Sequence, residues 1–140
     1  MRNVTIFDMK PEKITEQLCL AYCNQVGIDV SVIDSKATFS QKSNTYKKSK
    51  SAPEGFPDLV GNTQSGVAVY IELKAKGKIS TLRDKQYLFL KNKIQQNCFA
   101  CAVDSDEMLH DIYMNWIKAD NKIDYLLSKL PKIKSISSLL

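Results

Sequence analysis

The segment GFPDLVGNTQSGVAVYIELK, residues 55–74, decides the fold that we expect for this chain. A short apolar segment at 57–60 and the run VAVYIEL at 67–73 have the composition of β-strands, and the turn-forming stretch GNTQSG joins them. The sequence therefore predicts a β-hairpin. The second strand has too few polar residues to be half-exposed, so we place it in the centre of a sheet.

Charged residues lie at both ends of this apolar hairpin. Residues two apart on a strand point to the same face, so Glu72 and Lys74 project side by side. A turn centred near Ser65 sets Asp58 directly opposite Glu72. Two carboxylates about 4 Å apart repel by roughly 4 kcal/mol at an effective dielectric of about 20, so either one takes up a proton or a hard divalent cation bridges them. An E-x-K pair alone is more typical of a solvated strand face.

The sequence on either side of the hairpin alternates helical and extended segments. We interpret the polar, Ser- and Lys-rich residues 34–54 as a long loop. The other elements that we expect are a helix at 11–26 ended by Gly27, a strand at 28–33, a helix from about Ser80 or Thr81 to Asn97, a buried strand at 98–103, and helical sequence at 105–130 that stops before Pro131. This order predicts an α/β fold.

The composition is that of an ordinary globular protein. The chain has 140 residues, of which 44% are hydrophobic and 25% charged, so it is long enough to bury a core. A net charge of +5 mildly favours a polyanionic partner such as nucleic acid. No apolar run reaches the roughly 18 residues of a membrane span, and the N-terminus lacks a signal-peptide core, so we expect a cytoplasmic protein.

Two helices place a polar side chain on an apolar side. Gln86 falls within the apolar stripe of its helix, where it is either a core amide satisfied by the backbone or a site residue. Glu16 falls on the apolar side of the first helix. Glu12, one turn earlier, competes with Glu16 for any role at a site.

Four cysteines admit two interpretations. The spacings C-x-x-x-C at Cys19 and Cys23 and C-x-x-C at Cys98 and Cys101 suit a four-thiolate zinc site. Residues three apart on a strand point to opposite faces, however, which speaks against Cys98 and Cys101 sharing one ion. We favour small buried thiols.

Together these residues resemble the PD-(D/E)XK nuclease superfamily, and in particular its VRR-NUC branch, the viral replication and repair nucleases. The pattern of that branch is a glutamate in the first helix, G-x-P-D before the second strand, E-x-K on the third strand, and S-x(n)-Q at the start of the next helix. The matching residues here are Glu16, Gly55-Phe56-Pro57-Asp58, Glu72-Leu73-Lys74, Ser80 and Gln86. The resemblance covers about residues 12–105.

This resemblance implies a restriction-endonuclease-like core, with a mixed sheet flanked by helices, and Mg²⁺- or Mn²⁺-dependent hydrolysis of DNA. With the chain length and the element order, we expect a single nuclease domain over 1–140, with its core at about 12–105, C-terminal helices at 105–130 and a tail at 131–140. The resemblance also implies a homodimer that cuts branched DNA, including four-way junctions, in a bacterial or virus-infected host cytosol. The site residues that it implies are the metal ligands Asp58, Glu72, Glu16 and the Leu73 backbone carbonyl, with Lys74 for the attacking water and Gln86 in support.

Two groups of basic residues are candidates for contacts with DNA phosphates. In the loop before Gly55, which lacks arginine, lysines surround Tyr46, a candidate for stacking on a base or sugar; a solvated loop is the alternative. The loop lysines are Lys42, Lys47, Lys48 and Lys50. The second group, closer to the expected metal site, comprises Lys76, Lys78, Arg83 and Lys85.

Two other functions stay open on the sequence alone. One is a catalytically silent protein with a nuclease fold that binds nucleic acid or a protein partner. The other is a restriction-like endonuclease that reads a base sequence, although 140 residues leave little room for a recognition element.

Overall fold

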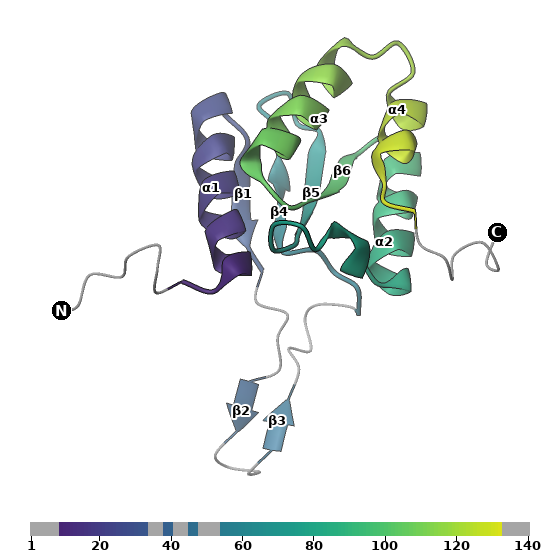
Figure 1. Ribbon diagram of the computed structural model, residues 1–140. Coiled ribbons are helices and arrows are strands. Elements are labelled where there is room, and N and C mark those ends of the chain that lie inside the picture. The colour runs from purple at the N-terminus through teal and green to yellow at the C-terminus, as the bar shows by residue number, and fades with distance from the viewer. Residues whose placement is uncertain (1–8, 34–37, 41–44, 48–53, 133–140) are drawn as a thin grey trace.

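The protein is an α/β fold built on a four-stranded mixed sheet that helices flank (Figure 1). The computed structural model describes residues 9–33, 38–40, 45–47 and 54–132. The strands lie in the order β1-β4-β5-β6, in which β6 runs parallel to β5 and the other neighbours are antiparallel. Their bounds are β1 Asp29–Val32, β4 Leu59–Asn62, β5 Ala68–Leu73 and β6 Phe99–Val103.

Helices cover both faces of the sheet. The helices are α1 Pro11–Val26, α2 Asp84–Gln95, α3 Asp106–Lys118 and α4 Lys122–Lys129. On one face, the ring of Phe99 from β6 packs against Tyr113 of α3, with ring centroids 5.4 Å apart. On the opposite face, Tyr70 of β5 packs against Phe89 of α2 at 5.6 Å. Helix α1 packs beside α3, and α4 beside α2 (Figure 1).

The predicted hairpin is confirmed, although its first strand covers residues 59–62 rather than the expected 57–60. Strands β4 and β5 pair antiparallel from Leu59↔Ile71 to Asn62↔Ala68, a register centred on Ser65. Thr63 stabilises the turn, because its hydroxyl accepts the backbone N–H of Val67 at 3.1 Å. Strand β5 lies between β4 and β6, so its predicted central position is also confirmed.

The first helix agrees with the sequence prediction at both ends. Pro11 occupies the first turn, where its missing N–H leaves no hydrogen bond unmade. Gly27 closes the helix at a left-handed φ of 80°, and its N–H bonds to the carbonyl of Cys23.

The start of α2 was predicted too early. Residues 79–81 form a single 3₁₀ turn, and the α-helix begins at Asp84. The reason is a cap that competes with Ser80 and Thr81: the side-chain oxygen of Gln86 accepts the backbone N–H of Arg83 at 3.0 Å, which fixes the first helical turn there.

The loop prediction for residues 34–54 was partly wrong. Residues Thr38–Ser40 (β2) and Thr45–Lys47 (β3) form a two-stranded antiparallel ribbon, set apart from the main sheet in Figure 1. The rest of that segment up to residue 53 lies outside the described residues. Helices α3 and α4 correspond to the helical sequence at 105–130, interrupted where Asn121 caps α4.

No helix in the described part of the chain is long and apolar enough to cross a membrane.

Candidate functional site

Asp58 and Glu72 lie at the same end of the hairpin. Extending the register by one pair beyond Leu59↔Ile71 sets the two carboxylates opposite each other, as the sequence predicts. The backbone fixes Asp58 on two sides. Its Oδ2 accepts the N–H of Leu73 at 2.9 Å, and its carbonyl accepts the N–H of Ile33 at 2.8 Å. The aspartate is therefore held in place by both neighbouring segments of the sheet.

Gly55 brings the chain before Asp58 against the start of α2. Its φ of +84° lies in the left-handed region, and a Cβ at this position would come 2.7 Å from the backbone carbonyl oxygen of Lys85. Pro57 is fully buried in the same segment. The G-x-P-D sequence thus docks this segment on the first turn of α2, where Gln86 also lies.

Glu72 is the most deeply buried carboxylate of the site, at 3% exposure. Its Oε1 accepts a hydrogen bond from Nε2 of Gln86 at 3.0 Å and lies 3.9 Å from the Lys74 ammonium. Its Oε2 is buried and receives no hydrogen bond from any described residue. A buried carboxylate oxygen without a donor is costly, so this atom needs a proton or a cation.

The surroundings of Glu72 favour its protonated form. Burial, followed by the negative charge of Asp58, raises the pKa of Glu72 to about 9, against an opposing effect of Lys74. At neutral pH Glu72 therefore holds a proton that a cation would have to displace.

Gln86 connects the acidic and basic parts of the site. Its Oε1 accepts hydrogen bonds from the Lys74 ammonium at 3.1 Å and from the N–H of Arg83, while its amide nitrogen donates to Glu72. Gln86 is 6% exposed, so this amide is a buried polar group whose bonds the site itself satisfies. The structure brings together Asp58, Glu72, Lys74 and Gln86.

The two carboxylates of α1 that the sequence left open have different surroundings. Glu16 forms an ion pair with Lys13, and no contact of Glu16 with the site is found among the described residues. Glu12, in contrast, is the α1 residue whose charge further raises the pKa of Glu72. Sequence spacing alone left these two glutamates open; the charge of the exposed Glu12 is the smallest of the effects on the pKa of Glu72, and Glu16 is the more buried of the two.

The basic residues near the site are exposed, and some have partners. Lys76 and Lys78 follow strand β5 in a loop held by a hydrogen bond from the N–H of Gly77 to Asp104 Oδ2 at 3.0 Å. Lys85 pairs with Glu54 at 2.6 Å. Arg83 lines a hollow of about 400 Å³ that adjoins Gln86 at the start of α2.

The other proposed DNA contacts cannot be placed as side chains. Lys42, Lys48 and Lys50 lie outside the described residues. Tyr46 and Lys47 belong to the short strand β3, which is described only as backbone.

The donor set suits a hard divalent cation. Two carboxylates and the carbonyl of Leu73 are oxygen ligands, and Mg²⁺ typically takes one or two protein carboxylates plus substrate phosphates. The Oε2 atom of Glu72, buried without a donor, fits such an ion. Within the described ranges, no group of three or more His, Cys, Asp or Glu residues is arranged to hold a metal, so ligands from substrate or water would complete the shell.

The thiols do not form the alternative zinc site in the described part of the chain. Cys19, Cys23 and Cys101 are free and buried near one another, and burial raises the pKa of Cys19 to about 12 and that of Cys23 to about 11. Cys98 is half-buried and lines a separate pocket.

Sequence reasoning missed two contacts of the site. The Leu73 N–H that holds Asp58 carries no side-chain signal, because any residue at that position supplies it. The bond from Arg83 to Gln86 was detectable, since glutamine three residues after a helix cap is a capping-box spacing.

The chain matches no protein-family model and no curated protein. The functional argument therefore depends on the geometry of the site.

Proposed function

We propose that this protein is a metal-dependent endonuclease with a restriction-endonuclease-like core, related to the VRR-NUC branch of the PD-(D/E)XK superfamily. One observation carries the proposal: the buried Glu72 carboxylate lies opposite Asp58 with one oxygen lacking a donor, two residues before Lys74. This arrangement is unfavourable as a purely structural feature, because it buries the Glu72 carboxyl group beside a second acid, the partly exposed Asp58.

Asp58, Glu72 and the carbonyl of Leu73 would hold Mg²⁺ or Mn²⁺ in this proposal. When bound, the cation supplies Lewis-acid stabilisation of a phosphodiester and lowers the pKa of water. The protein contributes a rigid cradle, since Asp58 is hydrogen-bonded to the backbone of β5 and Glu72 to Gln86. Electrostatic stabilisation of this kind acts most strongly at fixed, partly desolvated positions.

Lys74 would orient the attacking water and stabilise negative charge on the phosphate. Its ammonium is held between Glu72 and the amide oxygen of Gln86, and its side chain is only 13% exposed. A lysine fixed in this way can stabilise negative charge on the reacting group without the side chain having to change position during the reaction.

The proposed substrate is DNA, with branched forms such as four-way junctions preferred, and the proposed active form is a homodimer in the cytoplasm. The net charge of +5 and the exposed Lys76, Lys78 and Arg83 beside the site support a polyanionic substrate. Preference for branched DNA comes from the family resemblance.

A cleavage panel tests the proposal directly. Purified protein is incubated with linear duplex, flapped duplex and four-way junction DNA in Mg²⁺, Mn²⁺ or EDTA, beside the isosteric variant Glu72→Gln. We expect metal-dependent cutting, strongest on the junction, that Glu72→Gln abolishes while DNA affinity stays within about threefold of wild type. Glu107→Gln, an exposed position on α3, is the matched control.

Each of the other outcomes selects a different function. If no nucleic acid is cut with either metal although DNA binds, the protein is a binding factor. If one duplex sequence is cut and the junction is not preferred, it is a sequence-specific endonuclease.

A further inference from the structure

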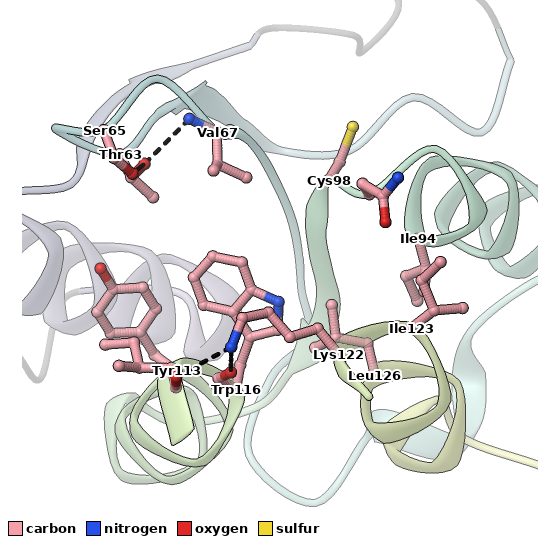
Figure 2. A pocket seen from close by; sticks show the side chains of 12 residues that line it. Thr63, Ser65, Val67, Ile94, Cys98, Tyr113, Trp116, Lys122, Ile123 and Leu126 are labelled. Atoms are coloured by element: carbon pink, nitrogen blue, oxygen red, sulfur yellow. Dashed lines mark hydrogen bonds between the residues drawn. The ribbon is translucent and has the colours of Figure 1, made fainter. Parts of the chain in front are cut away.

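A separate pocket lies at the end of the hairpin opposite the acidic site. It has a volume of about 370 Å³ and is bordered by the β4–β5 turn, the end of α2 with the connection to β6, and helices α3 and α4 (Figure 2). Asp58 and Glu72 lie at the other ends of the same two strands. The pocket therefore does not belong to the proposed catalytic site.

The walls of the pocket are mainly apolar. Its volume lies within the range of about 300–1,000 Å³ that is usual for small-molecule sites. The hydroxyl groups of Thr63 and Ser65 bond each other at 3.0 Å, which uses one of their two O–H donors. None of the twelve lining residues, all of them in the described part of the chain, is acidic.

Trp116 presents an unused donor to this pocket. Its side chain is 8% exposed and is held between the rings of Phe99, at 5.1 Å, and Tyr113, at 5.8 Å. Figure 2 shows the nitrogen edge of the indole turned toward the middle of the pocket. Among the described residues, no hydrogen bond involves the Nε1–H. The Nε1–H therefore faces the pocket without an acceptor from the described residues, so a ligand in the pocket can receive it.

Lys122 sets the charge of the pocket without offering a donor. Its ammonium donates to the carbonyls of Trp116, Ile117 and Ala119 at 2.9, 2.9 and 3.1 Å, which uses all three of its N–H groups. It also lies 5.6 Å from the Trp116 ring centroid. This fixed positive charge, with no acid among the lining residues, disfavours a cationic ligand, and because its three N–H groups are taken it offers no hydrogen bond to an anion.

We propose that this pocket binds a small, uncharged, mostly apolar aromatic molecule whose hydrogen-bond acceptor receives the Nε1–H of Trp116. The apolar walls favour an aromatic ring system, and the indole N–H favours a ligand with a hydrogen-bond acceptor. The positive charge of Lys122 disfavours a cation. The site is independent of the proposed nuclease activity.

The test uses two ring systems that differ at one atom, quinoline, which has a ring-nitrogen acceptor, and naphthalene, which has none. Trp116 is the only tryptophan in the sequence, so its indole N–H resonance and its fluorescence both report on this pocket. We expect quinoline to move the indole proton resonance downfield and to bind about 2- to 10-fold more tightly than naphthalene, as a single net hydrogen bond implies.

Two variants separate the donor from the cavity. Trp116→Phe keeps an aromatic ring but removes the N–H, so the ratio of the two affinities should fall to about one in ligand-observed NMR. Val67→Phe fills the pocket and leaves Trp116 in place, so the resonance shift should disappear even if Trp116→Phe does not fold. The proposal is overturned if quinoline leaves the indole resonance unmoved at its solubility limit, if both probes bind wild type equally, or if Val67→Phe binds quinoline unchanged.

Discussion

Nε2 of Gln86, on helix α2, donates a hydrogen bond of 3.0 Å to Oε1 of Glu72, on strand β5. The other end of the same amide accepts the Lys74 ammonium at 3.1 Å. The buried side chain of Gln86 thus fixes the Glu72 carboxyl group and the Lys74 ammonium of the proposed site relative to each other. Because Gln86 also caps α2 through Arg83, the start of the helix and the site depend on the same group.

Gln86→Ala should weaken the site without unfolding the protein. Gln86 is a positioning residue, and loss of such a support typically costs about 10- to 100-fold in activity or metal affinity. We expect DNA cleavage to fall by that factor and the half-saturating Mg²⁺ concentration to rise, because Glu72 loses a donor that favours its ionised form. Gln96→Ala, at the exposed end of α2, is the matched control. Unchanged Mg²⁺ dependence in Gln86→Ala would contradict the assigned role.

Lys74→Met should remove catalysis and leave cation binding intact. Methionine keeps the unbranched shape of the side chain but lacks the charge, so cleavage should fall by about 100-fold or more. Stabilisation of the fold by Mg²⁺, measured as a rise in Tm, should persist, since the carboxylates remain. Lys118→Met, exposed in the last turn of α3, should behave as wild type. Cleavage by Lys74→Met above about a tenth of the wild-type rate would show that Lys74 does not act on the reacting groups.

The pKa of Glu72 predicts how stability depends on pH in the absence of divalent cations. Its folded pKa of about 9 lies above the ordinary value of 4.5, so between these values the folded state keeps a proton that the unfolded state releases. The free energy of unfolding should therefore fall as pH rises, by at most about 1.4 kcal/mol per pH unit. Below pH 4.5 both states are protonated and this contribution is flat.

Denaturant unfolding in EDTA from pH 5 to 8 measures this slope. The raised pKa values of Cys19, Cys23 and Tyr22 lie near 11 or 12, above this range. Glu72→Gln has no group that ionises at this position, so its free energy of unfolding lacks this pH dependence. The difference in free energy of unfolding between the two proteins should therefore become steadily smaller as the pH is lowered from 8 to 5. Parallel profiles would mean that Glu72 titrates normally in the folded protein.

Much of this arrangement could be predicted from the sequence because it depends on local geometry. The hairpin register followed from the turn position and set Asp58 opposite Glu72. The start of α2 could not be placed, since it depends on a side chain that also serves the site. The pocket at Trp116 was also beyond sequence reasoning, because the hairpin turn, the α2–β6 connection and the α3–α4 pair, which are distant in the chain, form it.

The choice between two glutamates of α1 was beyond sequence reasoning for another reason. Glu12 and Glu16 lie one helical turn apart on the same side, and only the position of α1 on the sheet distinguishes them. We expect Glu12→Gln to lower the pKa of Glu72 and Glu16→Gln to leave it unchanged, because Glu12 acts on Glu72 through its charge. Carboxyl-carbon NMR titration of Glu72 at low ionic strength measures both. A larger effect from Glu16→Gln would reverse the assignment.

Gly55 should be required for both stability and activity. Besides its left-handed φ, the close approach of its backbone to α2 requires a residue without a Cβ. Gly55 and Gly66 have similar φ values, +84° and +91°, so alanine at either position carries a similar backbone strain of roughly 1–2 kcal/mol. Gly66 has open space around its Cβ position, whereas a Cβ on Gly55 would come 2.7 Å from the backbone oxygen of Lys85. We therefore expect Gly55→Ala to destabilise the protein more than Gly66→Ala in denaturant unfolding.

Gly55→Ala should also lose DNA cleavage at temperatures where it stays folded, because the shifted segment carries Asp58 away from Glu72. Equal losses of stability, with cleavage retained in both variants, would show that the contact of Gly55 with α2 does not position the aspartate.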